Sequence, residues 1–278
     1  MTGDAQVLTL GPLVLPWAGV VLLLAWLAGS TVHDRSAARA GLPPGPHAWG
    51  VALAALAAAR LAFVLRYAGA YAAEPWAALD IRDGGWSPAW GLAAAGAYVL
   101  LLWLRRNAWR RAVGLGTGVG MALWLAGSAA LHLAQPGARA PLPAWQGVAL
   151  DASTVRLPAL QGRPVVINLW ASWCPPCRRE MPVLLSAQQT HPGVRFLWVN
   201  QGESPEVAAG FAAAQGLPVA DVVLDQAGQL GRLLGHRALP TTLFYDAAGR
   251  LALVRSGELS AGTLAQHLEA MGAGLSKE

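Results

Sequence analysis

Two cysteines are the residues in this sequence best suited to carry out chemistry. Cys174 and Cys177 are the only cysteines among the 278 residues, and they are three positions apart. On the first turn of a helix such a pair lies side by side, so the sulfurs can close a disulfide, and the helix N-terminus favours the thiolate of the first cysteine. The spacing therefore predicts a redox dithiol.

Two other interpretations of the cysteine pair are a static disulfide and half of a zinc site. A zinc site needs four ligands as a rule, and the sequence offers no second Cys pair or paired histidines. We therefore expect no metal and no cofactor beyond the redox-active disulfide itself.

The residues around the pair alternate between strand and helix patterns. The run 165–171, VVINLWA, is typical of a central strand buried on both faces. A helix should follow from Pro175 to about Gln189, and Ser260 suits the N-cap of a last helix. The patterns also predict helices at 206–215 and 227–234, and strands at 194–200, 222–225, 241–245 and 251–256.

The segment 168–182, NLWASWCPPCRREMP, resembles the TlpA/ResA-like thioredoxin family of membrane-tethered, extracytoplasmic thiol–disulfide oxidoreductases. The resemblance covers about residues 140–275 and implies an α/β thioredoxin fold, with a central mixed sheet flanked by helices. Leu239-Pro240-Thr241-Thr242 matches the family's cis-proline loop, which faces the disulfide. Pro240 should therefore be cis, and the backbone of Leu239 should pair with a substrate strand.

The mechanism that the resemblance implies is thiol–disulfide exchange with protein substrates. Cys174 attacks a substrate disulfide and Cys177 resolves the mixed disulfide; the reverse sequence oxidises a dithiol. Glu180 matches an acidic position that assists proton transfer in the family, and an exposed helix charge is the alternative. Trp173 is expected at the rim of the site. Asn168 stands where thioredoxin has a buried aspartate, so another group or water must handle that proton.

Composition separates the chain into two halves. The whole is 55% hydrophobic and only 13% charged, against about 25% charged in ordinary soluble domains, which argues against a cytosolic enzyme and excludes a disordered chain. Residues 1–139 hold ten Arg against five acidic residues, whereas residues 140–278 are neutral. The excess basicity follows membrane topology, and we expect no nucleic-acid partner.

The first half contains four apolar stretches long enough to cross a bilayer as helices. We therefore predict an all-α transmembrane domain at 1–134, a Pro-rich linker at 135–146 and the thioredoxin-like domain at 147–278. The four predicted spans lie at 8–29, 48–69, 84–104 and 112–134.

Arginines in the predicted loops indicate orientation. The first and third loops hold six, and the second holds Arg82 against three acidic residues. By the positive-inside rule both termini lie outside, which places the catalytic domain in the periplasm of a multi-pass protein of a bacterial inner membrane. Because the spans lack cysteine, reducing equivalents must come from a separate membrane electron donor.

The membrane half has a resemblance of its own. The segments 60–67, 84–87 and 91–92 resemble the N-terminal half of prolipoprotein diacylglyceryl transferase, although Ala89 stands at that family's histidine. Arg60, inside a span, holds either an anionic lipid headgroup or a purely structural contact. Gly114–Gly120 is not a dinucleotide loop; its small residues at four-residue spacing predict close helix packing.

Three functions follow from these patterns. The leading one is a membrane-tethered periplasmic reductase of protein disulfides, such as those of apocytochromes during heme attachment. The second is a lipid-modifying protein related to the diacylglyceryl transferase, with an appended redox domain. The third is a non-enzymatic scaffold.

Overall fold

The computed structural model describes residues 7–10, 13–43, 45–72, 75–134, 140–236 and 238–272. They divide into two compact units. The helical unit spans residues 6–66 and 85–135, and the redox unit combines residues 67–84 with the chain from residue 136 onward.

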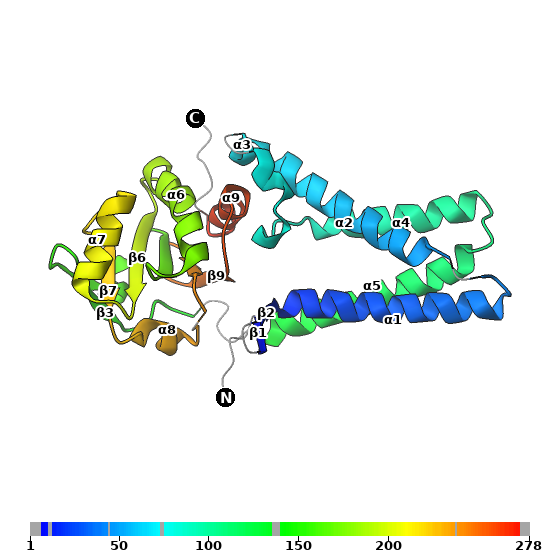
Figure 1. Cartoon of the computed structure of the whole chain (residues 1–278), viewed down its shortest axis with the longest axis horizontal. Coiled ribbons are helices and arrows are strands. Elements are labelled where there is room, and N and C mark those ends of the chain that lie inside the picture. The colour runs from blue at the N-terminus through cyan, green and yellow to red at the C-terminus, as the bar shows by residue number, and fades with distance from the viewer. Residues whose placement is uncertain are drawn as a thin grey trace. The chain divides into compact units, whose positions relative to one another are not determined.

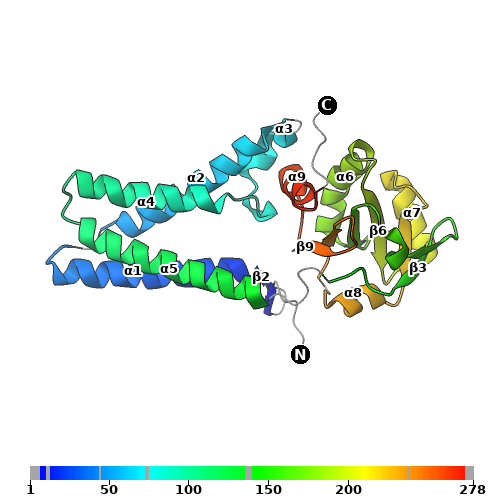
Figure 2. The ribbon, with the colours of Figure 1, turned by 180° about the vertical axis from the view of Figure 1, so that it is seen from behind.

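The described residues of the helical unit form the helices α1, α2, α4 and α5, which are drawn in Figure 1. α1 packs along α5, and α2 packs along α4; the same pairing is visible from behind in Figure 2. Leucines on the outer faces, such as Leu24, Leu53 and Leu61, are exposed, as expected where lipid replaces water. The elements are β1 (Val7–Leu10), β2 (Leu13–Pro16), α1 (Trp17–Arg39), α2 (His47–Arg66), α4 (Pro88–Leu104) and α5 (Arg110–Ala134).

Three of these helices, rather than the predicted four, are long and apolar enough to cross a membrane: α1, α2 and α5. The predicted span 84–104 forms a helix only from Pro88, because proline is accepted at a helix start and the residue before it is driven out of the helical region. The 17 residues of α4 measure about 25 Å, short of the roughly 30 Å of hydrocarbon.

The predicted first span, 8–29, is displaced along the chain. Its first part forms the antiparallel hairpin β1–β2, and the helix begins after Pro16, which occupies the N-cap. The helix then continues to Arg39, well beyond the predicted end. Hydropathy alone did not distinguish an apolar hairpin from an apolar helix.

Glycines bring α1 and α5 together. A Cβ on Gly29 would lie 2.7 Å from the carbonyl oxygen of Gly116, and a Cβ on Gly116 would lie 2.6 Å from the carbonyl oxygen of Gly29. Gly120, four residues after Gly116, also lies against Gly29. The predicted close packing through small residues is thus confirmed.

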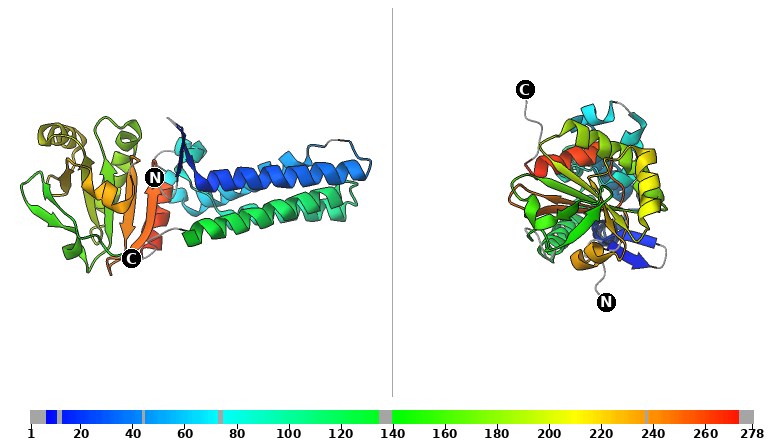
Figure 3. Two further views of the ribbon diagram at one scale, coloured as in Figure 1. Left: turned by 90° about the horizontal axis from the view of Figure 1, so that it is seen from below. Right: turned by 90° about the vertical axis from the view of Figure 1, so that its left-hand side faces the viewer.

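The redox unit is built on a seven-stranded mixed sheet of order β4-β3-β7-β6-β5-β8-β9. β5 pairs in parallel with β6 and β6 with β7, while the other neighbours are antiparallel. Figure 3 shows this sheet between its helices. The strands are β3 (Gln146–Ala149), β4 (Thr154–Arg156), β5 (Val165–Trp170), β6 (Arg195–Gln201), β7 (Val222–Asp225), β8 (Thr241–Tyr245) and β9 (Leu251–Ser256).

Side chains of β5 alternate between two cores. Val166 and Trp170 pack with residues of α6, α7 and α9, whereas Ile167 and Leu169 pack with residues of α8 on the other face. The strand is buried along its whole length, as its apolar run predicts. The helices are α6 (Pro175–Thr190), α7 (Pro205–Gln215), α8 (Gln229–Leu234) and α9 (Ala261–Ala270).

The α/β order predicted from Val165 onward is confirmed to within a few residues, including Ser260 as the N-cap of α9. The sequence patterns missed β3, β4 and the 3-10 turn Leu157–Leu160. Of the predicted linker, residues 135–139 lie outside the described residues. Residues 140–146 are attached to the redox unit, because Leu142 and Trp145 are buried and Leu142 N donates to the carbonyl of Gly249.

The stretch Tyr67–Gly84, here called the strap, packs with the redox unit through α3 against α9. It contains the short helix α3 (Ala68–Tyr71) and the 3-10 turns η1 (Pro75–Leu79) and η2 (Ile81–Asp83). The predicted boundaries had placed it with the transmembrane domain.

Candidate active site

The cysteine pair lies where β5 passes into α6. β5 ends at Trp170, and Cys174 is the N-cap of α6 with an extended backbone. Cys174 and Cys177 form a disulfide with a Cα–Cα distance of 5.3 Å. The backbone N–H of Cys177 points at the Cys174 sulfur, 3.3 Å away. In the reduced state the same helix N-terminus stabilises a thiolate on Cys174.

The two sulfurs differ in access. Cys177 is fully buried, while Cys174 keeps 3% of its surface exposed. The preceding Trp173 is 68% exposed and so presents a large apolar surface next to Cys174. This arrangement lets an incoming thiolate or disulfide reach Cys174 first, with Cys177 held behind it.

The Leu239–Pro240 peptide bond is cis, as the resemblance implies. β5 and β8 are antiparallel with Leu169 opposite Thr241, so Pro240 lies beside the end of β5, four residues before Cys174. The carbonyl of Pro240 accepts a hydrogen bond from Gly257 N at 2.9 Å, which ties this loop to the end of β9. The sheet therefore brings the predicted cis-proline loop and the cysteine loop to the same edge.

A cavity of about 310 Å³ opens beside this loop. It is lined by polar and small residues of three segments together with Leu239. His236, four residues before Pro240 in the sequence, lines the same cavity as Leu239. The full lining is Gln201, Gly228, Gly231, Arg232, His236 and Leu239.

Glu180 is completely buried beneath the cysteine loop, so it is not an exposed helix charge. It lies one turn after Cys177 on α6. Asn168 Nδ2 donates to Glu180 Oε1 at 2.7 Å, and Leu259 N donates to Oε2 at 3.0 Å. Asn168 Nδ2 also lies 2.9 Å from the hydroxyl of Thr242. Asn168 thus orients a carboxyl group supplied by the neighbouring helix.

Burial controls the charge of Glu180. Loss of solvation raises the pKa of its carboxyl to about 8, although the hydrogen bonds from Asn168 and Leu259 act in the opposite direction. Glu180 therefore holds its proton at neutral pH and can release it just above. A carboxyl group with a pKa near that of a thiol, one helical turn from Cys177, is suited to exchange protons during dithiol chemistry.

A second carboxylate, missed in the sequence, fixes the loop ahead of Cys174. Ser172 donates to Glu203 from its backbone N–H at 2.8 Å and from its hydroxyl at 2.5 Å. Asn200 Nδ2 donates to the same carboxylate at 2.6 Å. Although partial burial opposes it, these hydrogen bonds lower the pKa of Glu203. A lone glutamate on a predicted loop gave no signal of this role.

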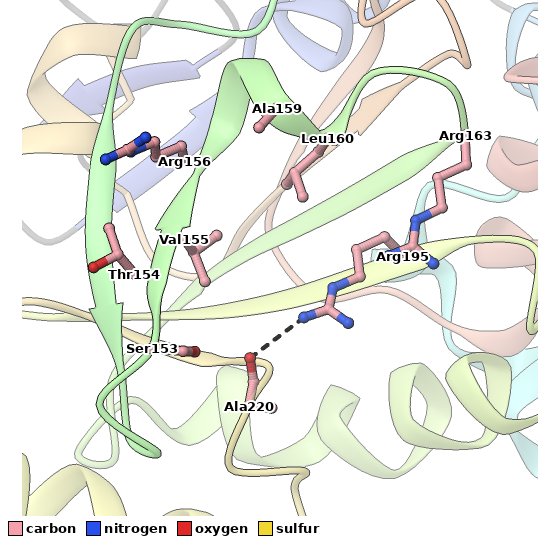
Figure 4. A pocket seen from close by; sticks show the side chains of 9 residues that line it. All are labelled: Ser153, Thr154, Val155, Arg156, Ala159, Leu160, Arg163, Arg195 and Ala220. Atoms are coloured by element: carbon pink, nitrogen blue, oxygen red, sulfur yellow. Dashed lines mark hydrogen bonds between the residues drawn. The ribbon is translucent and has the colours of Figure 1, made fainter.

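A larger pocket, of about 580 Å³, lies elsewhere (Figure 4). Arg163 and Arg195 reach into it from the amino ends of β5 and β6, whereas Cys174 follows the carboxyl end of β5. The six residues of β5 separate the two ends by about 20 Å. Arg195 is engaged by Asp221 and by the carbonyl of Ala220. This pocket does not belong to the cysteine site.

Arg60, singled out in the membrane half, lies in the helical unit. Its Nη1 donates to the carbonyl of Gly85 at 2.8 Å, and its guanidinium carbon lies 5.9 Å from the centre of the Phe63 ring. A Cβ on Gly85 would lie 2.7 Å from Arg60 Nη1. These contacts favour the structural interpretation of Arg60 over a headgroup site.

Comparisons with known proteins match the half of the chain that holds the cysteines. The family model for Redoxin matches residues 135–267. The thiol:disulfide interchange protein HelX of Rhodobacter capsulatus is 30% identical, over 52% of this chain and 81% of that protein. Thiol-disulfide oxidoreductase ResA of Geobacillus thermodenitrificans is 33% identical, over 44% of this chain and 71% of that protein.

Among solved structures, a putative thiol:disulfide interchange protein DsbE from Chlorobium tepidum is 29% identical, with a TM-score of 0.45. It is matched over 50% of this chain and 99% of its own. The matches to HelX and ResA each cover more than two thirds of the relative. This chain therefore belongs to the same family as HelX and ResA and is a thiol–disulfide oxidoreductase.

Proposed function

We propose that this chain is a membrane-tethered disulfide reductase that acts on protein substrates outside the cytoplasm. The observation that carries the proposal is the access of Cys174, at the N-cap of α6 beside the exposed Trp173, with Cys177 buried behind it. The cis bond before Pro240 lies at the same sheet edge. In this proposal an extended substrate segment approaches the sulfur of Cys174 between Trp173 and Leu239.

The proposed reaction passes two electrons from the enzyme dithiol to the substrate disulfide. The Cys174 thiolate attacks one substrate sulfur, and the other leaves as a thiolate that takes up a proton. The Cys177 thiolate then attacks Cys174, releasing the second substrate thiol. The product is the Cys174–Cys177 disulfide seen in this structure. Because neither cysteine lies in a membrane helix, a separate membrane electron donor must regenerate the dithiol.

Glu180 is the group that we assign to proton transfer in this cycle. Cys177 must lose a proton before it can attack, and no water reaches a fully buried thiol directly. Glu180 is equally buried, is held by Asn168 and Leu259, and titrates near pH 8. Asn168 cannot itself take the proton, so it serves to orient the carboxyl group.

The orientation of α5 supports an extracytoplasmic site. Four arginines precede or begin this helix, and the redox unit follows its other end. By the positive-inside rule the arginine end lies in the cytoplasm, so the dithiol lies on the opposite side, the periplasm in a bacterium with an inner membrane. Disulfide chemistry is used in that compartment.

Trapping the thiols in cells tests both direction and location. Cells expressing the full chain are treated with a membrane-impermeant maleimide, and the redox state of the Cys174–Cys177 pair is read from the mass shift on a gel. A reductase is expected to be mostly dithiol at steady state and to react without lysis. A pair found mostly as the disulfide would contradict the reductase direction, and labelling only after lysis would contradict the location. Cys174→Ser/Cys177→Ser identifies the background.

A further inference from the structure

The strap makes specific contacts with the redox unit. Tyr67 Oη donates to Glu269 Oε2 of α9 at 3.0 Å. Ser260, the N-cap of α9, donates to Asp83 Oδ2 at 2.8 Å, and Tyr71 donates to the same oxygen at 3.1 Å. Asp83 is only 5% exposed. This buried carboxylate accepts hydrogen bonds from one hydroxyl group of the strap and one of α9. Such a satisfied buried group indicates a specific contact between the strap and α9.

Two glycines allow the strap to come close. A Cβ on Gly262, in the first turn of α9, would lie 2.7 Å from the ring of Tyr71. A Cβ on Gly84 would lie 2.6 Å from Nη1 of Arg255 on β9. The end of the strap therefore lies directly against the Arg255 guanidinium.

Arg255 belongs to a row of polar residues that crosses the sheet. Asn168 of β5 is paired with Thr242 of β8, and Thr242 is paired with Arg255 of β9. Directly paired residues of neighbouring strands point to the same face. Asn168 bonds both Thr242 and Glu180, so the row begins under Glu180 and ends at the strap.

Arg255 interacts electrostatically with a carboxyl group at each end of the row. The carboxyl groups of Asp83 and Glu180 both act on its guanidinium, and burial lowers the pKa of Arg255 against their pull. Among the described residues, Glu258, which is paired with Arg179, acts on Glu180, and His267 lies near Arg255. Burial and the nearby Arg255 lower the pKa of His267 to about 4, so His267 is neutral at the pH of catalysis.

We propose that the strap is a positioning element of the redox site, in which Asp83 holds Arg255 at the end of the row and so sets how strongly Arg255 stabilises the Glu180 carboxylate. The inference rests on the proposed role of Glu180 in proton transfer. It makes Asp83, which lies between α2 and α4 in the sequence, a positioning residue for chemistry at Cys177.

The test is the pH profile of disulfide reduction by the full chain in lipid nanodiscs, with insulin as substrate. Glu180→Gln should remove one inflection from the profile, which identifies the inflection of Glu180. Asp83→Asn keeps the size of this side chain but removes its negative charge and weakens its hydrogen bonds with Ser260 and Tyr71, so Arg255 favours the Glu180 carboxylate more strongly. The same inflection should move toward acid by about half a pH unit. The double variant Asp83→Asn/Glu180→Gln should have the same pH profile as Glu180→Gln alone.

Asp246→Asn is the matched control, because Asp246 is a carboxylate at the far end of the β8–β9 hairpin that pairs with Arg250. Its pH profile of disulfide reduction should match that of the wild type. The strap inference fails, and the role of Glu180 stands, if the inflection lies at the same pH in Asp83→Asn and Asp246→Asn while Glu180→Gln still removes it. If Glu180→Gln removes no inflection, both fail.

Hydrogen exchange of the same nanodisc samples covers the case in which Asp83→Asn loosens the fold. The strap contact predicts faster exchange in the first turn of α9, where Ser260 and Gly262 lie, and unchanged exchange in β3 and β4. Exchange at wild-type rates in α9 would show that Asp83 does not hold the strap and would overturn the inference.

Discussion

Asn168 Nδ2 lies 2.7 Å from Glu180 Oε1, in a fully buried pair that joins the strand before the cysteine loop to the helix after it. The amide supplies a donor that cannot change its charge, and the carboxyl supplies the titrating group. In the proposed cycle, proton handling is divided between these two elements, with the strand orienting the carboxyl group and the helix supplying it.

This pair predicts a pH dependence of stability. Glu180 has a pKa of about 8 when folded against 4.5 ordinarily. Below pH 4.5 both states hold the proton. Between 4.5 and 8 the unfolded chain releases it while the folded chain does not, so the free energy of unfolding falls as pH rises, in total by on the order of a few kcal/mol. Glu180→Gln should flatten this slope in denaturant titrations of the redox unit's tryptophan fluorescence. An unchanged slope would contradict the buried, protonated state of Glu180.

The carboxylate of Glu203 should matter for rate because it holds the loop that presents Cys174. Glu203→Gln keeps the size but weakens three charge-assisted contacts with Ser172 and Asn200, each worth about 1.5–3 kcal/mol. We expect kcat for insulin reduction to fall roughly tenfold, and the melting temperature to fall as well. Glu206→Gln, at an exposed glutamate in the first turn of α7, should leave kcat unchanged. Equal kcat values for the two variants would contradict a role of Glu203 in holding the loop that presents Cys174.

Packing of α1 on α5 should depend on one glycine and not on its neighbour. Gly116→Ala places a methyl group 2.6 Å from the carbonyl oxygen of Gly29 and should destabilise the helical unit by about 1–3 kcal/mol. A methyl group on Gly118 meets nothing within 4 Å, so Gly118→Ala should be neutral or stabilising. Unfolding of the full chain in mixed detergent micelles measures both; equal stability of the two variants would contradict this helix contact.

Much of the redox unit could be predicted because its signals are local. The apolar run ending at Trp170, the spacing of Cys174 and Cys177, and the position of Pro240 each carry their structure in a few neighbouring residues. β3 and β4 were missed because they are three or four residues long and half exposed, so neither apolar length nor a repeated alternation marks them.

The remaining features depend on contacts between distant segments, which the sequence does not display. From the sequence alone, Glu180 could equally be a charge on the surface of the helix; only the packing of α6 over Asn168 shows that it is buried. Glu203 lies 31 residues from Ser172, and Asp83 lies 177 residues from Ser260. In the membrane half, hydropathy located the apolar stretches, but Pro16 and Pro88 decided where the helices begin.

The most direct test of the central claim is a trap for the mixed disulfide on Cys174. The full chain carrying Cys177→Ser is expressed in cells and separated on non-reducing gels, with Cys174→Ser/Cys177→Ser beside it. We expect discrete adducts with other proteins that disappear on reduction and require Cys174, and their identification names the substrates and the electron donor. If Cys177→Ser forms no adducts under conditions in which the wild-type pair cycles between dithiol and disulfide, exchange through Cys174 is contradicted.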